Sequence, residues 1–230
     1  MRAGGRAAAA GGTPLWVKVC GVRDLATAEV AVDAGATAIG LVFDRRSPRW
    51  IDDRTARELV AAVGSRVDCI GVFVDADADQ LNRTADRVGL HALQLHRTDG
   101  QVDPAIVTCV DRPLIPAFSL REPAPDLAPL LAWWPSEPIL VDAGTPERPG
   151  GTGERADWDA AAVVACHRPV WLAGGLGPAT VAAALERVAA TGVDASSRLE
   201  SAPGVKDPLL VRAFVAAART AARAGGCPRG

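Results

Sequence analysis

Two side chains suited to proton transfer each end an apolar segment of the sequence. Cys20 closes the run Trp16–Cys20, and Asp142 is the last residue of Ile139-Leu-Val-Asp. A thiolate near a cation can act as a base or nucleophile, and a carboxylate after a buried strand must be paired, hydrated or protonated. The two could form a base and an acid on opposite sides of a pocket. Taken singly, such a cysteine is more often a small buried hydrophobe, and such an aspartate often caps a loop.

Three further polar side chains are candidates for binding a substrate. Arg49 stands in Ser47-Pro-Arg, and its planar guanidinium suits bidentate binding of a carboxylate. The neighbouring Arg45 and Arg46 fit solvated loop charges better. Gln94 and His96 end another apolar run, and for the histidine both a ligand contact and a purely structural hydrogen bond stay open.

Glycine-rich and serine-rich turns in the last third of the chain are typical of phosphate sites. Ala173-Gly-Gly-Leu-Gly-Pro leads toward a predicted helix, and glycines let backbone N–H groups approach a phosphate closely. Asp194-Ala-Ser-Ser follows the next strand, which strengthens the phosphate reading over that of a plain turn. The candidate residues are Gly151, Gly153, Gly174, Gly175, Asp194, Ser196, Ser197 and Arg198.

The elements that must position these residues alternate along the whole chain. Eight short segments are mostly continuous apolar runs, as in parallel strands buried on both faces. Their ends are about 20 to 30 residues apart, the length of one βα unit. We therefore predict a single-domain (β/α)8 TIM barrel; the rival is a doubly wound open sheet. The predicted strands are Trp16–Cys20, Ala38–Phe43, Cys69–Val74, Ala92–His96, Leu114–Phe118, Ile139–Ala143, Val170–Ala173 and Gly192–Ala195.

Helix signals stand between the strands. Asp24 can cap the first helix and either Asp52 or Asp53 the second, while Pro208 opens the last. In a barrel of this kind the loops after the strands carry the site. The expected helices are 25–34, a segment ending before Gly64, Ala78–Val88, the proline-rich 122–138 with its flanks, Ala179–Ala190 and a last helix from Pro208.

The composition limits the classes of protein to which the chain can belong. The 230 residues are 49% hydrophobic and 23% charged with a net charge of −2, which is typical of a soluble globular domain and gives no electrostatic case for nucleic acid or an anionic membrane. The 5 cysteines include no C-x-x-C pair, so reduced thiols are favoured over a zinc cluster or disulfide framework. We expect residues 1–13 to be a disordered Ala/Gly-rich extension, 14–224 the barrel and 225–230 a frayed tail.

In chain order, the motifs resemble those of the phosphoribosylanthranilate isomerase family of tryptophan biosynthesis. The resemblance extends from Val17 to Phe214, and the motifs are jointly specific although each alone is weak. They are Val17-Lys-Val-Cys-Gly, Gly40-Leu-Val-Phe with Ser47-Pro-Arg, Gly71-Val-Phe-Val, Gln94-Leu-His, Leu140-Val-Asp, Gly150-Gly-Thr-Gly with Asp157-Trp, Ala173-Gly-Gly-Leu, Asp194-Ala-Ser-Ser and Pro203-Gly-Val-Lys-Asp.

The resemblance implies an Amadori rearrangement of N-(5-phosphoribosyl)anthranilate to 1-(2-carboxyphenylamino)-1-deoxyribulose 5-phosphate. It implies that Cys20 is the general base and Asp142 the general acid, that Arg49 binds the anthranilate carboxylate, and that the phosphate lies on the glycine and serine turns. It implies no metal and no organic cofactor. The expected partner is a small phosphorylated sugar amine, with no nucleic acid and no membrane, bound by a cytoplasmic monomer or homodimer.

Four positions depart from the family's usual pattern. Arg97 and Arg198 stand where the family has glycine, and Pro116 and Glu154 stand where it has lysine. Most of these changes fall near the expected ligand, so they bear on the substrate more than on the fold. The alternatives are a divergent paralogue acting on another amino-sugar or aryl-amine substrate in a specialised pathway, and an inactive phosphosugar-binding protein.

Overall fold

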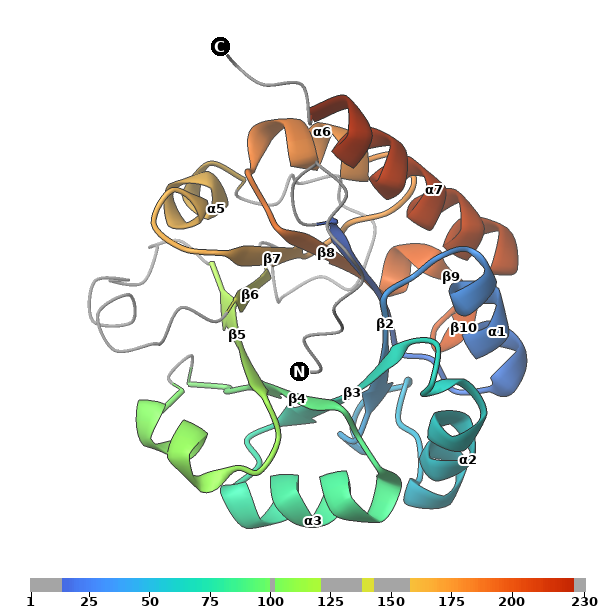
Figure 1. The fold of residues 1–230 in the computed structure, drawn as a ribbon, viewed down its shortest axis with the longest axis vertical. Helices are drawn as coiled ribbons and strands as arrows, with labels where there is room; N and C mark the ends of the chain where they lie inside the picture. The colour runs from blue at the N-terminus through green and yellow to red at the C-terminus, as the bar shows by residue number, and fades with distance from the viewer. Residues whose placement is uncertain (1–13, 100–101, 121–137, 143–157, 226–230) are drawn as a thin grey trace.

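Eight parallel strands close into a barrel in the order of the sequence, in a computed structural model that describes residues 14–99, 102–120, 138–142 and 158–225. Figure 1 shows the ring of strands with the helices outside it. The (β/α)8 prediction is confirmed, and the open-sheet rival is excluded because β1 pairs with β8. The strands are β1 Trp16–Cys20, β2 Ala38–Val42, β3 Asp68–Val74, β4 Ala92–His96, β5 Leu114–Ser119, β6 Ile139–Asp142, β7 Val170–Ala173 and β8 Gly192–Ala195.

Two helices begin at the capping aspartates that the sequence indicates, and a third begins after Asp77, which was not among the predicted capping residues. Asp24, Asp52 and Asp77 each accept a hydrogen bond from the backbone N–H three residues on, so Asp52 rather than Asp53 caps the second helix. The described helices are α1 Leu25–Asp33, α2 Asp53–Val63, α3 Ala78–Val88, the 3₁₀ helix η1 Pro104–Cys109, α5 Trp158–Ala165, α6 Val181–Arg187 and α7 Pro208–Gly225.

One helix is shorter than predicted. The pattern of 179–190 extends over more residues than α6, because Val188 adopts extended backbone angles and ends the helix. A hydrogen-bonded turn from Gly177 to Thr180 precedes its start. The predicted extension 1–13, the segment 122–137 of the fifth predicted helix and residues 226–230 of the predicted tail lie outside the described residues. The first residue of that predicted tail, Gly225, ends α7.

After β8 the chain adds a small outer hairpin. The 3₁₀ helix η2 Ser197–Leu199 leads into β9 Glu200–Ala202, which pairs antiparallel with β10 Val205–Lys206. Figure 1 shows this hairpin beside α1, outside the ring of strands. The hairpin therefore lies near the loops that follow β1 and β2.

The barrel interior changes from apolar to polar along its axis. At the end where the strands begin, the rings of Trp16 and Trp171 stack with centroids 3.6 Å apart. Alternation along each strand then turns every second side chain inward. The next inward residues include fully buried Lys18, with Gln94 and Asp194, and Cys20 follows at the carboxyl end. The mouth of the barrel is thus lined by polar groups above an aromatic floor.

In the described part of the chain, none of the helices combines the length and the hydropathy that a membrane crossing requires.

Candidate active site

Cys20 and Asp142 both stand at the carboxyl ends of their strands. Cys20 ends β1 and is 8% exposed, packed with the inward residues Val42 and Val72. Asp142 ends β6 in register with Ser119, two residues beyond the inward-facing pair of Ala117 and Leu140. Because β7 and β8 separate β6 from β1, the two candidate residues face the barrel mouth from different sides.

A buried lysine lies below Cys20 on the same strand. Lys18 is fully buried, and its Nζ donates hydrogen bonds of 2.8 Å to Gln94 Oε1 and 2.8 Å to Asp194 Oδ2. Burial would lower the pKa of Lys18, but the carboxylate of Asp194 and the neighbouring Cys20 outweigh it, and the pKa is raised. Lys18 therefore stays charged at neutral pH. It was not among the predicted site residues, although its place two residues before Cys20 in a strand puts it on the same face.

The predicted residues Gln94 and His96 continue this network across β4. Because Gln94 Oε1 accepts from Lys18, its amide nitrogen faces His96 Nε2 at 2.8 Å and must donate. Burial and the Lys18 charge lower the pKa of His96 to about 4. The ring is therefore neutral near pH 7 and carries its proton on Nδ1. The histidine thus makes the structural hydrogen bond that the sequence left open, and its partner is the side chain of Gln94.

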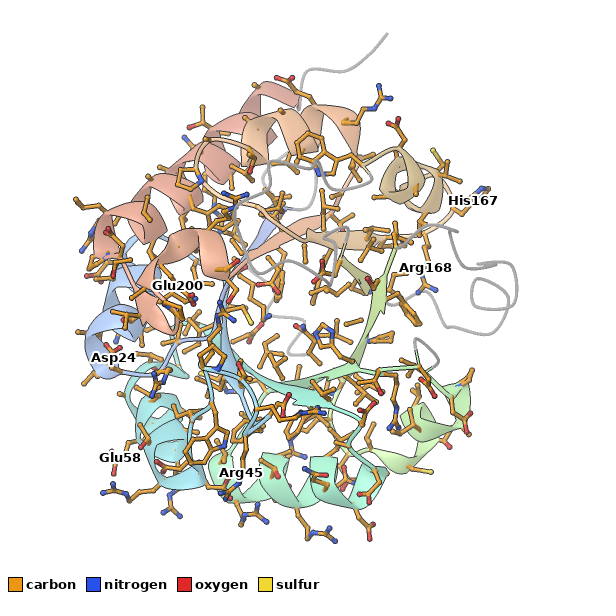
Figure 2. The ribbon with its side chains drawn as sticks, turned by 180° about the vertical axis from the view of Figure 1, so that it is seen from behind. Asp24, Arg45, Glu58, His167, Arg168 and Glu200 are labelled. Atoms are coloured by element: carbon orange, nitrogen blue, oxygen red, sulfur yellow. The ribbon has the colours of Figure 1, made fainter. Side chains whose placement is uncertain are left out.

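Arg49 is held by Glu200, which sequence reasoning did not select as a site residue. Its Nε donates to Glu200 Oε1 at 2.7 Å and its Nη2 to Oε2 at 2.8 Å. The arginine side chain is 23% exposed and the glutamate 4%. Figure 2 shows Glu200 on the same side of the barrel as Asp24 and opposite His167. The bidentate contact leaves the outer Nη1–Nη2 edge of the guanidinium for another carboxylate.

Gly21 makes room for this arginine. A Cβ on Gly21 would stand 2.6 Å from Arg49 Cδ, and its φ of +78° is in the left-handed region that favours glycine. The glycine that follows Cys20 thus lets the arginine side chain pack directly beside the candidate base. Two motifs far apart in the sequence meet at this contact.

Lys206 connects the arginine pair to the loop after β8. Its Nζ donates to Glu200 Oε1 at 2.7 Å and to the Ser196 carbonyl at 3.1 Å. Ser196 Oγ in turn donates to the Cys20 carbonyl at 3.1 Å. A hydroxyl has one proton to give, so the Ser196 hydroxyl proton is used in the bond to the Cys20 carbonyl. Glu200 was missed because its partner Arg49 is 151 residues away. Lys206 was missed although Glu200 and Ser196 lie only 6 and 10 residues from it.

The glycine turn after β7, which is predicted to bind the phosphate, has open space beside Gly175. Gly174 and Gly175 have φ of +92° and +64°, and a Cβ on Gly175 would meet nothing within 4 Å. Arg198 packs beside this turn, with its Cβ 2.9 Å from the position of a Cβ on Gly177. Ser197 and Arg198 are exposed. The residue that replaces the family glycine thus adds a cation next to the turn.

Other predicted positions are not part of this arrangement. Gly151, Gly153 and Glu154 lie outside the described residues. Pro116 lies between the inward-facing Ile115 and Ala117 of β5, so it points outward toward the helices. A change at Pro116 therefore does not alter the barrel mouth. Among the described cysteines, those at 20, 69, 109 and 166 are free thiols.

The environment of Cys20 contains opposing influences. Burial raises the pKa of its thiol, Lys18 and Lys206 lower it, and Asp194 raises it. The net shift is upward, so cations partly offset the cost of forming a thiolate in the barrel. Protonation of this thiol is therefore sensitive to the charges placed around it.

The closed barrel, with a thiol and a carboxylate at the carboxyl ends of its strands and an arginine held beside them, is typical of a (β/α)8-barrel enzyme with its candidate site at this end. A family model described as N-(5'-phosphoribosyl)anthranilate (PRA) isomerase matches residues 17–217. The chain belongs to this family of isomerases of tryptophan biosynthesis.

Sequence and structure comparisons agree on this family. The chain is 42% identical over 203 residues to the N-(5'-phosphoribosyl)anthranilate isomerase of Geobacter sp. strain M21, covering 88% of this chain and 97% of that protein. The crystal structure of the Thermotoga maritima phosphoribosylanthranilate isomerase has a TM-score of 0.80 and 32% identity, covering 90% of this chain and 99% of that one. A further isomerase structure, 29% identical with a TM-score of 0.77, holds reduced 1-(o-carboxyphenylamino)-1-deoxyribulose 5-phosphate, and the match covers 90% of this chain and 99% of that one.

Proposed function

We propose that the chain converts N-(5'-phosphoribosyl)anthranilate to 1-(2-carboxyphenylamino)-1-deoxyribulose 5-phosphate by an Amadori rearrangement, as a step of tryptophan biosynthesis. The observation that carries the proposal is that Cys20 and Asp142 end two strands of one barrel mouth. A related isomerase holds a reduced form of this product, which supports a phosphorylated sugar amine as the substrate.

The proposed chemistry opens the ribose ring. Asp142 as general acid gives a proton to the ring oxygen while the bond from that oxygen to C1' breaks, and the nitrogen lone pair forms an iminium with C1'. The iminium acidifies the C2' hydrogen. Cys20 as thiolate then removes that proton, and the electron pair forms a C1'–C2' double bond that neutralises the nitrogen. The resulting enol loses its hydroxyl proton and gains a proton at C1', which gives the ketone without net change in atoms.

Substrate binding is assigned to charged groups around the mouth. The outer edge of Arg49 binds the anthranilate carboxylate, because Glu200 occupies the other edge. We propose that the phosphate lies against Gly174, Gly175 and the backbone of 196–197, with Arg198 as a further cation. The substrate nitrogen itself accepts electrons, so the proposed mechanism routes no step through a metal or organic cofactor. We propose that the protein acts in the cytoplasm as a monomer or homodimer.

The test is a coupled assay. Phosphoribosylanthranilate is formed in situ from anthranilate and phosphoribosyl pyrophosphate, and its consumption is followed by loss of fluorescence. We expect rapid consumption by the wild type and loss of most turnover in Cys20→Ala and Asp142→Asn. The matched control is Cys69→Ala, because Cys69 is fully buried in the outer core and its pKa is raised to about 12 by burial and Asp68.

The outcomes separate the competing functions. Turnover by the wild type that is unaffected by either site variant would refute the assigned acid and base. Tight binding without turnover would favour a phosphosugar-binding protein. No binding by a folded wild type would favour a divergent paralogue with another amino-sugar or aryl-amine substrate, and Arg198→Gly would then show whether the loop substitution is the cause.

A further inference from the structure

The strongest unexplained feature of the site is a full positive charge buried beneath the candidate base. We infer that Lys18 is a positioning residue for Cys20: its ammonium group, held in place by Gln94 and Asp194, is the cation against which the catalytic thiolate forms. This inference rests on the proposed role of Cys20 as the base. It assigns a role to a side chain that the family resemblance did not select.

The geometry fixes the ammonium group. Lys18 is fully buried, and two of its three N–H donors bond Gln94 and Asp194 at 2.8 Å each. These partners lie on β4 and β8, so the ammonium group is bonded from two sides of the barrel. Beyond these two bonds, the described residues accept no further hydrogen bond of this length from Lys18, so the third donor is left for a group above the lysine.

Cys20 is the group that stands above it. Lys18 and Cys20 alternate with Val19 on β1 and point to the same inner face. Both side chains pack against Gly40 of the adjacent strand: a Cβ there would lie 2.8 Å from Cys20 Sγ and 3.0 Å from Lys18 Cε. A larger residue at position 40 would therefore displace the thiol and the lysine stem from their shared position.

Asp194 keeps this cation charged. A buried lysine without a counter-ion tends to lose its proton, and the carboxylate at 2.8 Å prevents this. Only Oδ2 of Asp194 accepts a hydrogen bond from the lysine, whereas Oδ1 is buried with no hydrogen-bond partner among the described residues. Asp194 therefore stabilises the lysine through its negative charge, although its own hydrogen bonds are incomplete.

Other charged groups also face the thiol and influence its ionisation. From β8 Asp194 opposes thiolate formation, and from β10 Lys206 favours it. The neutral His96 and the Lys18-bound Gln94 lie on β4. Further ionisable groups around the mouth, in the part of the chain that the structure describes, include Arg49, which packs over Gly21, its partner Glu200, Asp142 at the end of β6 and Arg198 beside Gly177.

The test is a titration of the Cys20 thiolate by ultraviolet absorbance. Wild type minus Cys20→Ala isolates this thiol from the other cysteines, and the same difference is measured with Lys18→Met in both proteins. We expect Lys18→Met to move the ionisation upward by at least about one pH unit, a tenfold loss of thiolate at a fixed lower pH. The rising limb of kcat/KM against pH should move with it.

Two further variants keep the result interpretable. Arg66→Met removes a charge from a surface pair with Glu29 and should leave the titration unchanged. If Lys18→Met does not fold, Lys18→Met combined with Asp194→Asn removes the buried pair as a unit, and an upward shift is still expected because the lysine is the stronger influence. An unchanged titration in a folded variant would overturn the inference. Because the titration needs no substrate, it gives this answer even if phosphoribosylanthranilate proves not to be the substrate.

Discussion

Removal of one charge at Glu200 should weaken substrate binding through Arg49. The carboxylate accepts four hydrogen bonds, from Arg49 Nε and Nη2, from Lys206 Nζ and from the Gly204 N–H. In Glu200→Gln one oxygen becomes an amide donor that faces two of these donors. The less costly orientation of the amide places its oxygen at Oε1, where it still accepts from Lys206 and Arg49 Nε. The hydrogen bond from Arg49 Nη2 is then lost.

The magnitude follows from the burial of the pair. Breaking a buried ion pair by removing one partner costs about 3–5 kcal/mol, and the Glu200 side chain is only 4% exposed. At about 2–4 °C per kcal/mol for a chain of this size, the Tm should fall by roughly 10 °C. Because Arg49 is then held by one hydrogen bond, we expect KM for phosphoribosylanthranilate to rise about tenfold or more, the equivalent of about 1.4 kcal/mol. kcat should fall less.

The loss of stability should also depend on pH. Burial would raise the pKa of the Glu200 carboxyl, but Arg49 and Lys206 outweigh it, and the pKa is lowered from 4.5. The carboxylate thus contributes its stability above pH 4.5, and the contribution is lost as the pH falls through the folded-state pKa. Wild type and Glu200→Gln should therefore converge in unfolding free energy in acid.

Coupled assays and urea unfolding at several pH values check this prediction. The matched control is Glu29→Gln, the same chemical change in an exposed pair with Arg66, which should cost less than about 1 kcal/mol. An unchanged KM in a folded Glu200→Gln protein would refute the argument that Glu200 orients Arg49.

Two glycine substitutions extend these predictions. Gly21→Ala places a Cβ 2.6 Å from Arg49 Cδ at φ +78°, so KM should rise severalfold. Gly35→Ala, at φ +90° with open space around it, should lose a similar stability of about 1–2 kcal/mol and leave KM unchanged. Equal KM values for the two variants would contradict the packing argument. Gly192→Ala meets Trp171 Cδ1 at 2.5 Å at the far end of the barrel, so unfolding in urea should show a loss of about 1–3 kcal/mol with unaltered kcat and KM; a change in kcat would show that the aromatic floor couples to the mouth.

Much of the barrel could be predicted because its signals are local. A strand such as Val170–Ala173 is a short apolar run, and Asp24 caps a helix through a bond to Thr27, three residues on. The prediction for residues 179–190 was too long because alanine-rich sequence does not mark where packing ends a helix, and Val188 turns to extended backbone in the fold. Local propensity sets where elements form more firmly than where they stop.

The sequence alone determined the order of strands, the family resemblance and the strand-end positions of Cys20 and Asp142, since each depends on residue type and spacing along the chain. Only the tertiary structure decided what surrounds them. Lys18 meets Asp194 across 176 residues, and Arg49 meets Glu200 across 151. No local pattern encodes such partners, because closure of the barrel, rather than proximity in sequence, brings first and last strands together. The charges that tune the site are therefore a property of the closed barrel.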